Sequence, residues 1–147
     1  MADMIHHTDG QDYFIFDEDL YGYSVLRLSD LASVHYIPAE SCGNYTGKFE
    51  ETFIWFNCYY NPENNMLAVN VCIWSAPSSV IVMDFSDPMR IVEAKEWSDV
   101  YISCMDDYYD LDDIDFVRWQ GSKLICKAKG AKPAAFVLDG KVEVDFE

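Results

Sequence analysis

Apolar side chains recur at every second position over short runs along this 147-residue chain, and this two-residue period constrains the fold more than any other feature. The runs are rich in β-branched and aromatic residues and are bounded by Gly, Pro, Asn, Asp and Ser, as strands are. Polar turn sequences such as Asn61–Asn65, Gln120–Ser122 and Asp139-Gly140 separate neighbouring runs. An Asp-Gly pair supplies the positive φ angles that tight primed turns need. The sequence therefore predicts a mostly β protein built from hairpins.

Twelve runs carry the strand pattern, and helix is expected only as short pieces such as Asp110–Asp113. The histidine pair His6-His7 is interpreted as a frayed terminus, and His35 as a strand residue that meets a neighbour across the sheet. The run from Phe53 to Tyr60 alternates with apolar residues on both faces, which predicts either a central strand buried on both sides, the favoured interpretation, or a strand whose outer aromatic residues lie in an interface. The expected strands are Asp12–Phe16, Tyr23–Leu28, Ser33–Ile37, Thr52–Tyr60, Met66–Trp74, Val80–Phe85, Ile91–Ala94, Val100–Met105, Phe116–Trp119, Lys123–Ala128, Ala134–Leu138 and Lys141–Phe146.

The chain echoes itself at a constant offset. Leu28–Leu31 corresponds to Phe85–Pro88, and Met66–Val69 corresponds to Lys123–Cys126. This offset of about 57 residues leaves room for four strands in each repeat, which is typical of propeller blades. We therefore expect antiparallel four-stranded meanders within one domain, 1–147, with repeat units at about 12–45, 52–96 and 100–147.

Two segments resemble known repeats. Val80–Pro88, followed by Ile91-Val92, resembles the LVIVD-type repeat of bacterial β-propellers, and the region 116–126 is similar to the opening strands of WD-type blades. The resemblance implies blade-like sheets and a binding surface, since propellers carry unrelated functions. A chain with room for two or three blades is too short for a closed ring of four to eight. A β-sandwich or an open barrel remains the alternative architecture.

The charge of the chain excludes several kinds of partner. Asp and Glu total 26 against 10 for Lys and Arg, which gives a net charge of −16. Such a chain repels phosphate and anionic lipid, so direct binding to nucleic acid or to a membrane surface is excluded. Disorder is excluded as well, because 50% of the residues are hydrophobic and 16% are aromatic.

The negative charge is regional. Residues 1–115 carry a net charge of −18 and residues 116–147 carry +2. Two segments that contain tyrosines and no Lys or Arg, Asp3–Asp19 and Glu96–Asp115, concentrate the carboxylates. They are either solvated loops or a surface that resembles nucleic-acid phosphates and binds a basic protein. The candidate partner-binding residues are Asp17, Glu18, Asp19, Asp106, Asp107, Tyr108, Tyr109, Asp110, Asp112, Asp113 and Asp115.

No motif predicts a cofactor, a metal or a catalytic residue. Neither acidic segment has the spacing of an EF-hand loop, and the histidines and five cysteines have no CxxC or HxxxH partner. No nucleophile elbow and no Gly-rich phosphate loop is present. A calcium site of another kind, built from Asp106, Asp110, Asp112 and Asp113, stays open.

These observations predict a binding protein rather than an enzyme. The favoured function is an acidic inhibitor or immunity-type protein that engages a basic, nucleic-acid-acting partner such as a nuclease. The alternative is a propeller-like interaction module that uses exposed aromatic residues, with charge serving solubility; an enzyme of unrecognised motif is third. The odd number of cysteines and the absence of a signal sequence predict a reducing cytoplasm. A homodimer is compatible with the pattern, because the basic C-terminal region could face the acidic segments of a second copy.

Overall fold

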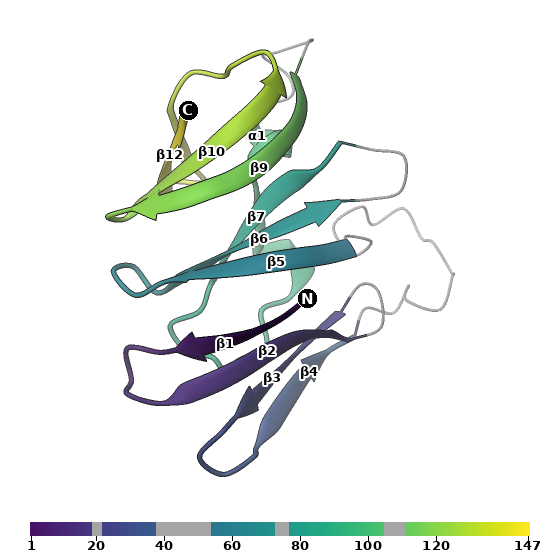
Figure 1. Ribbon diagram of the computed structural model, residues 1–147, viewed down its shortest axis with the longest axis vertical. Helices are drawn as coiled ribbons and strands as arrows, with labels where there is room; N and C mark the ends of the chain where they lie inside the picture. Colours follow the sequence, from purple (N-terminus) through teal and green to yellow (C-terminus); the bar gives the residue numbers. More distant parts are fainter. Residues whose placement is uncertain (19–21, 38–53, 73–76, 105–110) are drawn as a thin grey trace.

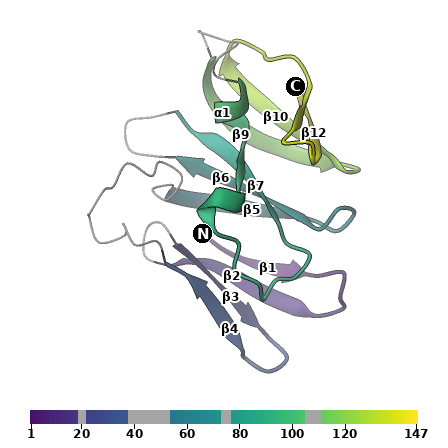
Figure 2. The ribbon, with the colours of Figure 1, turned by 180° about the vertical axis from the view of Figure 1, so that it is seen from behind.

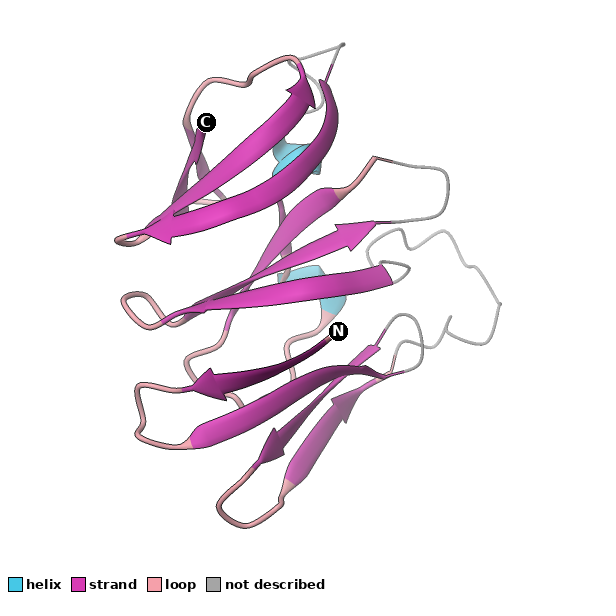
Figure 3. Cartoon of the chain, in the orientation of Figure 1, coloured by secondary structure: helices cyan, strands magenta, loops and turns pink. Residues whose placement is uncertain are grey.

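The computed structural model describes residues 1–18, 22–37, 54–72, 77–104 and 111–147. Over these residues the chain forms twelve β-strands in three four-stranded sheets, and helix is confined to two short pieces (Figure 3). The three sheets follow one another along the longest axis of the molecule (Figure 1). The prediction of a mostly β protein with four-stranded sheets is confirmed, and the described sheets do not close into a barrel.

The first and second sheets are antiparallel meanders in chain order. In the second sheet a long connection that contains the 3-10 helix η3 (Ala94–Glu96) joins the last two strands, and helix α1 (Val100–Cys104) follows directly. The first sheet consists of β1 (Ala2–His6), β2 (Asp12–Glu18), β3 (Gly22–Arg27) and β4 (Ser33–Tyr36), and the second of β5 (Ile54–Asn61), β6 (Met66–Cys72), β7 (Ser79–Asp84) and β8 (Ser98–Asp99).

The third sheet departs from the meander. Its strands are β9 (Leu111–Gln120), β10 (Lys123–Gly130), β11 (Phe136–Leu138) and β12 (Val142–Phe146), in the order β11-β12-β10-β9. Strand β12 therefore lies next to β10 and parallel to it. After β10 ends at Gly130, where φ is +90°, the chain forms β11, which does not pair with β10. The tight turn at Asp139-Gly140, with φ angles of 49° and 68°, then reverses the chain, so that β12 lies between β11 and β10.

The internal repeat is visible in the strands of the second and third sheets. Strands β5 and β9 begin at residues 54 and 111, β6 and β10 at 66 and 123, and β7 and β11 at 79 and 136, so that the three pairs share one offset. The echo between Leu28–Leu31 and Phe85–Pro88 also falls at equivalent points, directly after the third strand of the first and second sheets.

Two apolar layers hold the sheets together. Ile15 and Val25 of the first sheet pack with Leu67 and Met83 of the second in one buried cluster. The opposite face of the second sheet, which includes Ala68, packs with the third sheet in another cluster. Because successive side chains of a strand point to opposite faces, a middle sheet that is covered on both sides needs apolar residues at consecutive positions, as β6 and β7 have.

Three of the expected elements are wrong. Ile91–Ala94 is not a strand, Val100 begins helix α1, and residues 111–113 belong to strand β9 rather than to a helix. A short apolar run with β-branched residues fits a buried helix as well as a strand, so periodicity alone does not separate them. Here Asp99 decides between them, because its Oδ1 accepts the Ile102 N–H at 3.2 Å and thereby caps the first turn of α1.

Strand β5 breaks the alternation that the sequence predicts for it. A bulge between Trp55 and Asn57 inserts one extra residue into the pairing with β6. As a result, Trp55 and Cys58 both enter the cluster between the first and second sheets, and Phe56 is 49% exposed. The prediction that both faces of this strand are buried is therefore wrong at Phe56, and Phe53 lies outside the described residues.

Candidate functional site

The first strands of the three sheets meet on one face of the molecule. Strands β1, β5 and β9 are edge strands of their sheets and lie toward the viewer in Figure 1, whereas α1 and η3 lie toward the viewer in Figure 2, on the opposite face. A groove with a volume of about 620 Å³ crosses the three strands. Residues from all three sheets line it, among them Asp3, His6, Tyr59, Tyr60, Phe116 and Trp119.

Aromatic side chains with fixed positions form one wall of the groove. The rings of Tyr59 and Phe116 stack with their centroids 3.9 Å apart, and the Trp119 ring meets Phe116 edge-on at 6.3 Å. The Trp119 Nε1–H also donates to the Tyr59 carbonyl oxygen at 2.9 Å. All three residues are half-buried. A ligand therefore meets a preformed aromatic surface, which costs little side-chain entropy to use.

Backbone groups along the groove are already hydrogen-bonded to side chains. The Asp17 N–H donates to the Met1 carbonyl, so Met1 is at a position that forms hydrogen bonds with β2. In an antiparallel pair such positions alternate along the strand, so Met4 directs its backbone N–H and C=O away from β2. The Met4 N–H donates to Asp3 Oδ1 at 2.9 Å, and the Phe116 N–H of β9 donates to Asn70 Oδ1 at 3.0 Å. Together with the indole bond to the Tyr59 carbonyl, these contacts occupy one outward backbone group on each of the three edge strands. Side chains therefore supply much of the surface that the groove offers to a ligand.

Arg118 in the wall of the groove has a carboxylate partner, since its Nη1 lies 2.9 Å from Glu147 Oε1. His6 Nδ1 lies 2.6 Å from Asp12 Oδ1. Asp3 is exposed and has no cationic partner among the described residues. Within the described part of the chain, the groove therefore presents one carboxylate without an ion-pair partner.

A smaller pocket opens beside this carboxylate. It has a volume of about 230 Å³, lies between β1 and β5, and shares Asp3, Cys58 and Tyr59 with the groove. The Cys58 Sγ lies 3.9 Å from Asp3 Oδ2. Burial, followed by the negative charge of Asp3, raises the pKa of the Cys58 thiol to about 12. The thiol is neutral near pH 7 and is not an activated nucleophile.

The C-terminal ends of the two acidic segments lie toward one side of the molecule. The C-terminal end of β2 and the N-terminal end of β9 both lie on the side where β1 begins (Figure 1). Asp17 stands near the first of these ends, and Asp112, Asp113 and Asp115 stand near the second. Asp112 is exposed. Asp19, Asp106, Asp107, Tyr108, Tyr109 and Asp110 lie outside the described residues, and Glu18 is described only as the last residue of β2.

Several of these carboxylates have structural roles. Asp17 Oδ1 accepts a hydrogen bond from the Met1 ammonium group at 2.8 Å. Asp113 Oδ1 accepts the Ser78 N–H at 2.8 Å, and Asp115 Oδ1 accepts the Ser78 hydroxyl at 3.5 Å. They tie β9 to the residue before β7. Of the candidate residues whose side chains are described, Asp112 is thus the one most available to a partner.

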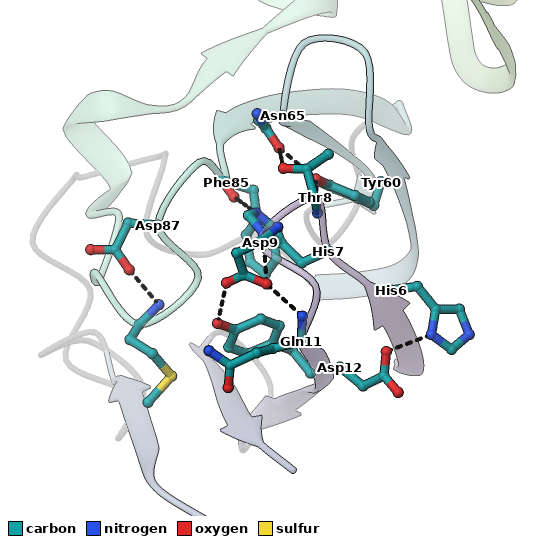
Figure 4. A network of polar contacts seen from close by, with 12 residues as sticks. His6, His7, Thr8, Asp9, Gln11, Asp12, Tyr60, Asn65, Phe85 and Asp87 are labelled. Carbon is teal, nitrogen blue, oxygen red and sulfur yellow. Dashed lines mark hydrogen bonds and ion pairs between the residues drawn. The ribbon is translucent and has the colours of Figure 1, made fainter. Parts of the chain in front are cut away.

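The interpretation of His6-His7 as a frayed terminus is wrong, because His7 is buried in the joint between the first and second sheets (Figure 4). Its Nε2 donates to the Phe85 carbonyl at 2.8 Å, and its Nδ1 accepts the Asp9 N–H at 3.1 Å. A carbonyl only accepts and an amide N–H only donates, so these partners assign the ring proton to Nε2. The ring also stacks on Tyr60, with centroids 5.2 Å apart.

This joint includes a chain of polar groups that superficially resembles a catalytic relay. Tyr13 Oη donates to Asp9 Oδ2 at 2.6 Å, and Asp9 Oδ1 lies 3.3 Å from His7 Nδ1. Both ring nitrogens of His7 already bind backbone groups, so neither is available to a substrate. The network holds the β1–β2 turn against the end of β7. His35, as predicted, meets its cross-strand neighbour, with Nδ1 2.6 Å from Ser24 Oγ.

The described residues contain no group of three or more His, Cys, Asp or Glu side chains that could hold a metal ion. Cys58, Cys104 and Cys126 are buried free thiols. None of the helices described is long and apolar enough to cross a membrane.

Sequence reasoning missed the groove, although the repeat contained a signal for it. Tyr59 and Phe116, which stack on each other, are separated by one repeat length and occupy equivalent positions in the first strands of consecutive sheets. Aromatic residues that recur at the repeat length mark a shared face. Without the packing of the sheets, however, they are indistinguishable from core residues.

The comparisons with known proteins add one relative. A segment of 62 residues is 40% identical to part of an uncharacterized protein of Acanthamoeba polyphaga mimivirus. The match covers 42% of this chain and 23% of the viral protein, so the chain spans less than a quarter of its relative over the matched segment. No family model matches the chain, and no solved structure matches it.

Proposed function

We propose that this chain is a non-enzymatic binding protein that takes a polypeptide segment of a basic partner protein into the groove across β1, β5 and β9. The observation that carries the proposal is the groove itself, which is lined by stacked aromatic side chains and by Asp3, a carboxylate without a cationic partner among the described residues. Clefts with aromatic walls and few polar groups are the usual form of binding sites. Tyr and Trp are also enriched at protein interfaces.

The charge distribution supports a basic partner. The arginines with described ion pairs are engaged within the chain, as in Arg27 with Asp30 at 2.7 Å and Arg90 with Glu96 at 2.9 Å. These pairs neutralise arginines and carboxylates in equal number, so the chain keeps its net charge of −16. Such a field accelerates the association of a basic protein and disfavours acidic ones.

Peptide selection tests the proposal. A library of random dodecapeptides displayed on phage is selected against the intact chain, with counter-selection against the Phe116→Ala variant, which removes the stack on Tyr59. We expect peptides that combine Lys or Arg with an apolar residue, and affinities that fall when the NaCl concentration rises from about 0.05 to about 0.5 M, because salt screens exposed charges. Selected peptides without basic residues, or with equal affinity for both proteins, would contradict the proposal.

A second candidate is an acidic, cytoplasmic inhibitor or immunity-type protein that imitates nucleic-acid phosphates. The observation that favours it is the common side of the stack on which β2 ends and β9 begins. Its test is the triple variant with Asn at Asp112, Asp113 and Asp115, in which Asn retains the oxygen acceptors that Ser78 uses. If this candidate is right, duplex DNA competes with the chain for binding to a basic nuclease. The triple variant should also bind that nuclease at least about tenfold more weakly than the parent chain does, since exposed charges drive the encounter.

A further inference from the structure

We infer that the small pocket between β1 and β5 holds the side chain of an arginine from the bound segment, with Asp3 as its carboxylate partner. The inference rests on the proposed binding of a basic partner and names the residue by which that partner is recognised. It follows from the size of the pocket, its charge and the occupied backbone groups around it.

The size of the pocket fits one long side chain. The volume of about 230 Å³ is several times the roughly 30 Å³ that a water molecule takes up in the liquid, so the pocket has room for a long side chain such as that of arginine. The pocket also opens into the groove through Asp3, Cys58 and Tyr59, so a chain lying in the groove can direct one side chain into it.

The charges around the pocket favour a cation. The positive group in its wall, the Met1 ammonium, is paired with Asp17 at 2.8 Å, whereas Asp3 has no cationic partner among the described residues. The Cys58 thiol beside Asp3 is neutral, because burial raises its pKa to about 12. A guanidinium group would therefore supply the missing counter-charge to Asp3 without displacing an existing ion pair.

The geometry favours arginine over lysine. Asp3 lines both the pocket and the groove. A planar guanidinium can donate two parallel hydrogen bonds to a carboxylate, whereas an ammonium group acts as a point charge. The Met4 N–H and the Tyr59 carbonyl oxygen are already hydrogen-bonded, so neither is available to the backbone of the bound segment.

NMR titration of the isotopically labelled chain with N-acetyl-arginine methylamide tests the inference. We expect chemical-shift changes at the backbone amides of Asp3, Cys58 and Tyr59, and weaker binding of the lysine analogue. The citrulline analogue has nearly the shape of arginine but no charge, and it should not bind in this pocket. Asp3→Asn keeps an oxygen for the Met4 N–H and should weaken arginine binding at least about tenfold, since charged hydrogen bonds are the strong ones. Glu143→Gln, a neutralised exposed carboxylate on β12, is the matched control and should bind as the parent does.

Two outcomes separate this inference from the proposed function. Equal binding of arginine and citrulline, or shift changes near Asp112 and not near Asp3, would overturn the arginine pocket and leave the binding of a basic partner in place. If a twelve-residue peptide of alternating Arg and Ala also produced no shift change anywhere in the chain, the proposed function would fail as well.

Discussion

The hydroxyl of Tyr23 makes one hydrogen bond whose loss can be predicted in magnitude. Tyr23 is 1% exposed, and its Oη accepts the backbone N–H of Val92 at 2.9 Å; Val92 is also 1% exposed. Tyr23→Phe keeps the ring in place against Trp55 and removes only the oxygen. The Val92 N–H is then left buried without a partner, which costs about 1–3 kcal/mol. For a chain of this length, a loss of 1 kcal/mol lowers Tm by about 2–4 °C, so we expect a decrease of roughly 2–12 °C.

Urea unfolding followed by tryptophan fluorescence measures this loss. The midpoint should decrease while the dependence of the unfolding free energy on urea stays the same, because the variant exposes the same surface on unfolding. Tyr59→Phe is the matched control, since the Tyr59 side chain is half-buried and no partner of its hydroxyl is described. If Tyr23→Phe changes the unfolding free energy by less than about 0.5 kcal/mol, which is typical of surface substitutions, the Val92 N–H is satisfied in another way and the reasoning is refuted.

Three further predictions concern stability and reactivity. Burial is the main reason why the pKa values of Tyr13 and Tyr23 rise to about 12 from the ordinary value near 10, so the unfolded chain loses these protons at lower pH than the folded chain does. The unfolding free energy should therefore fall as pH rises from about 10 to about 12. Urea titrations should show a less steep fall for Tyr23→Phe than for the parent chain. Gly140→Ala places a Cβ at a φ of +68° and should cost about 1–2 kcal/mol in thermal unfolding, although no atom lies within 4 Å of that Cβ; no loss would contradict the argument from backbone strain. Burial also raises the pKa values of the Cys58 and Cys126 thiols to about 12. Iodoacetamide at pH 8 should therefore label both cysteines only after denaturation, which mass spectrometry would detect. Rapid labelling of the native chain would contradict their burial.

The alternation of side chains and the turn residues were sufficient to predict the strands where both signals agreed. Asp139-Gly140 is an example, because the pair adopts the two positive φ angles that its composition predicts. The signals failed where one residue pattern fits two local structures. Val100–Cys104 is helical, and Asp99, a neighbour in the sequence, caps it. The bulge after Trp55 placed Trp55 and Cys58 in the same cluster, which a strict two-residue period does not predict.

The candidate site was less predictable than the fold. Charge counts pointed to Asp112, Asp113 and Asp115, but a sequence does not show that Ser78 occupies two of them. Nor does it show that Asp3 has no cationic partner among the described residues while Arg118, in the same groove, pairs with Glu147. Carboxylates of the same type differ in availability because ion pairs and hydrogen bonds form between residues that are far apart in the chain.

The sequence by itself determined the strand content, the hairpins, the internal repeat and the negative charge, because each depends on residue types and on their spacing along the chain. Only the tertiary structure decided how the strands pair and which residues lie together in space. It paired β12 with β10 in parallel, placed His7 in the joint between two sheets, and brought β1, β5 and β9 to one face. The groove exists because three sheets pack in series with their first strands on the same side, and the relative position of those strands depends on core contacts across the whole chain.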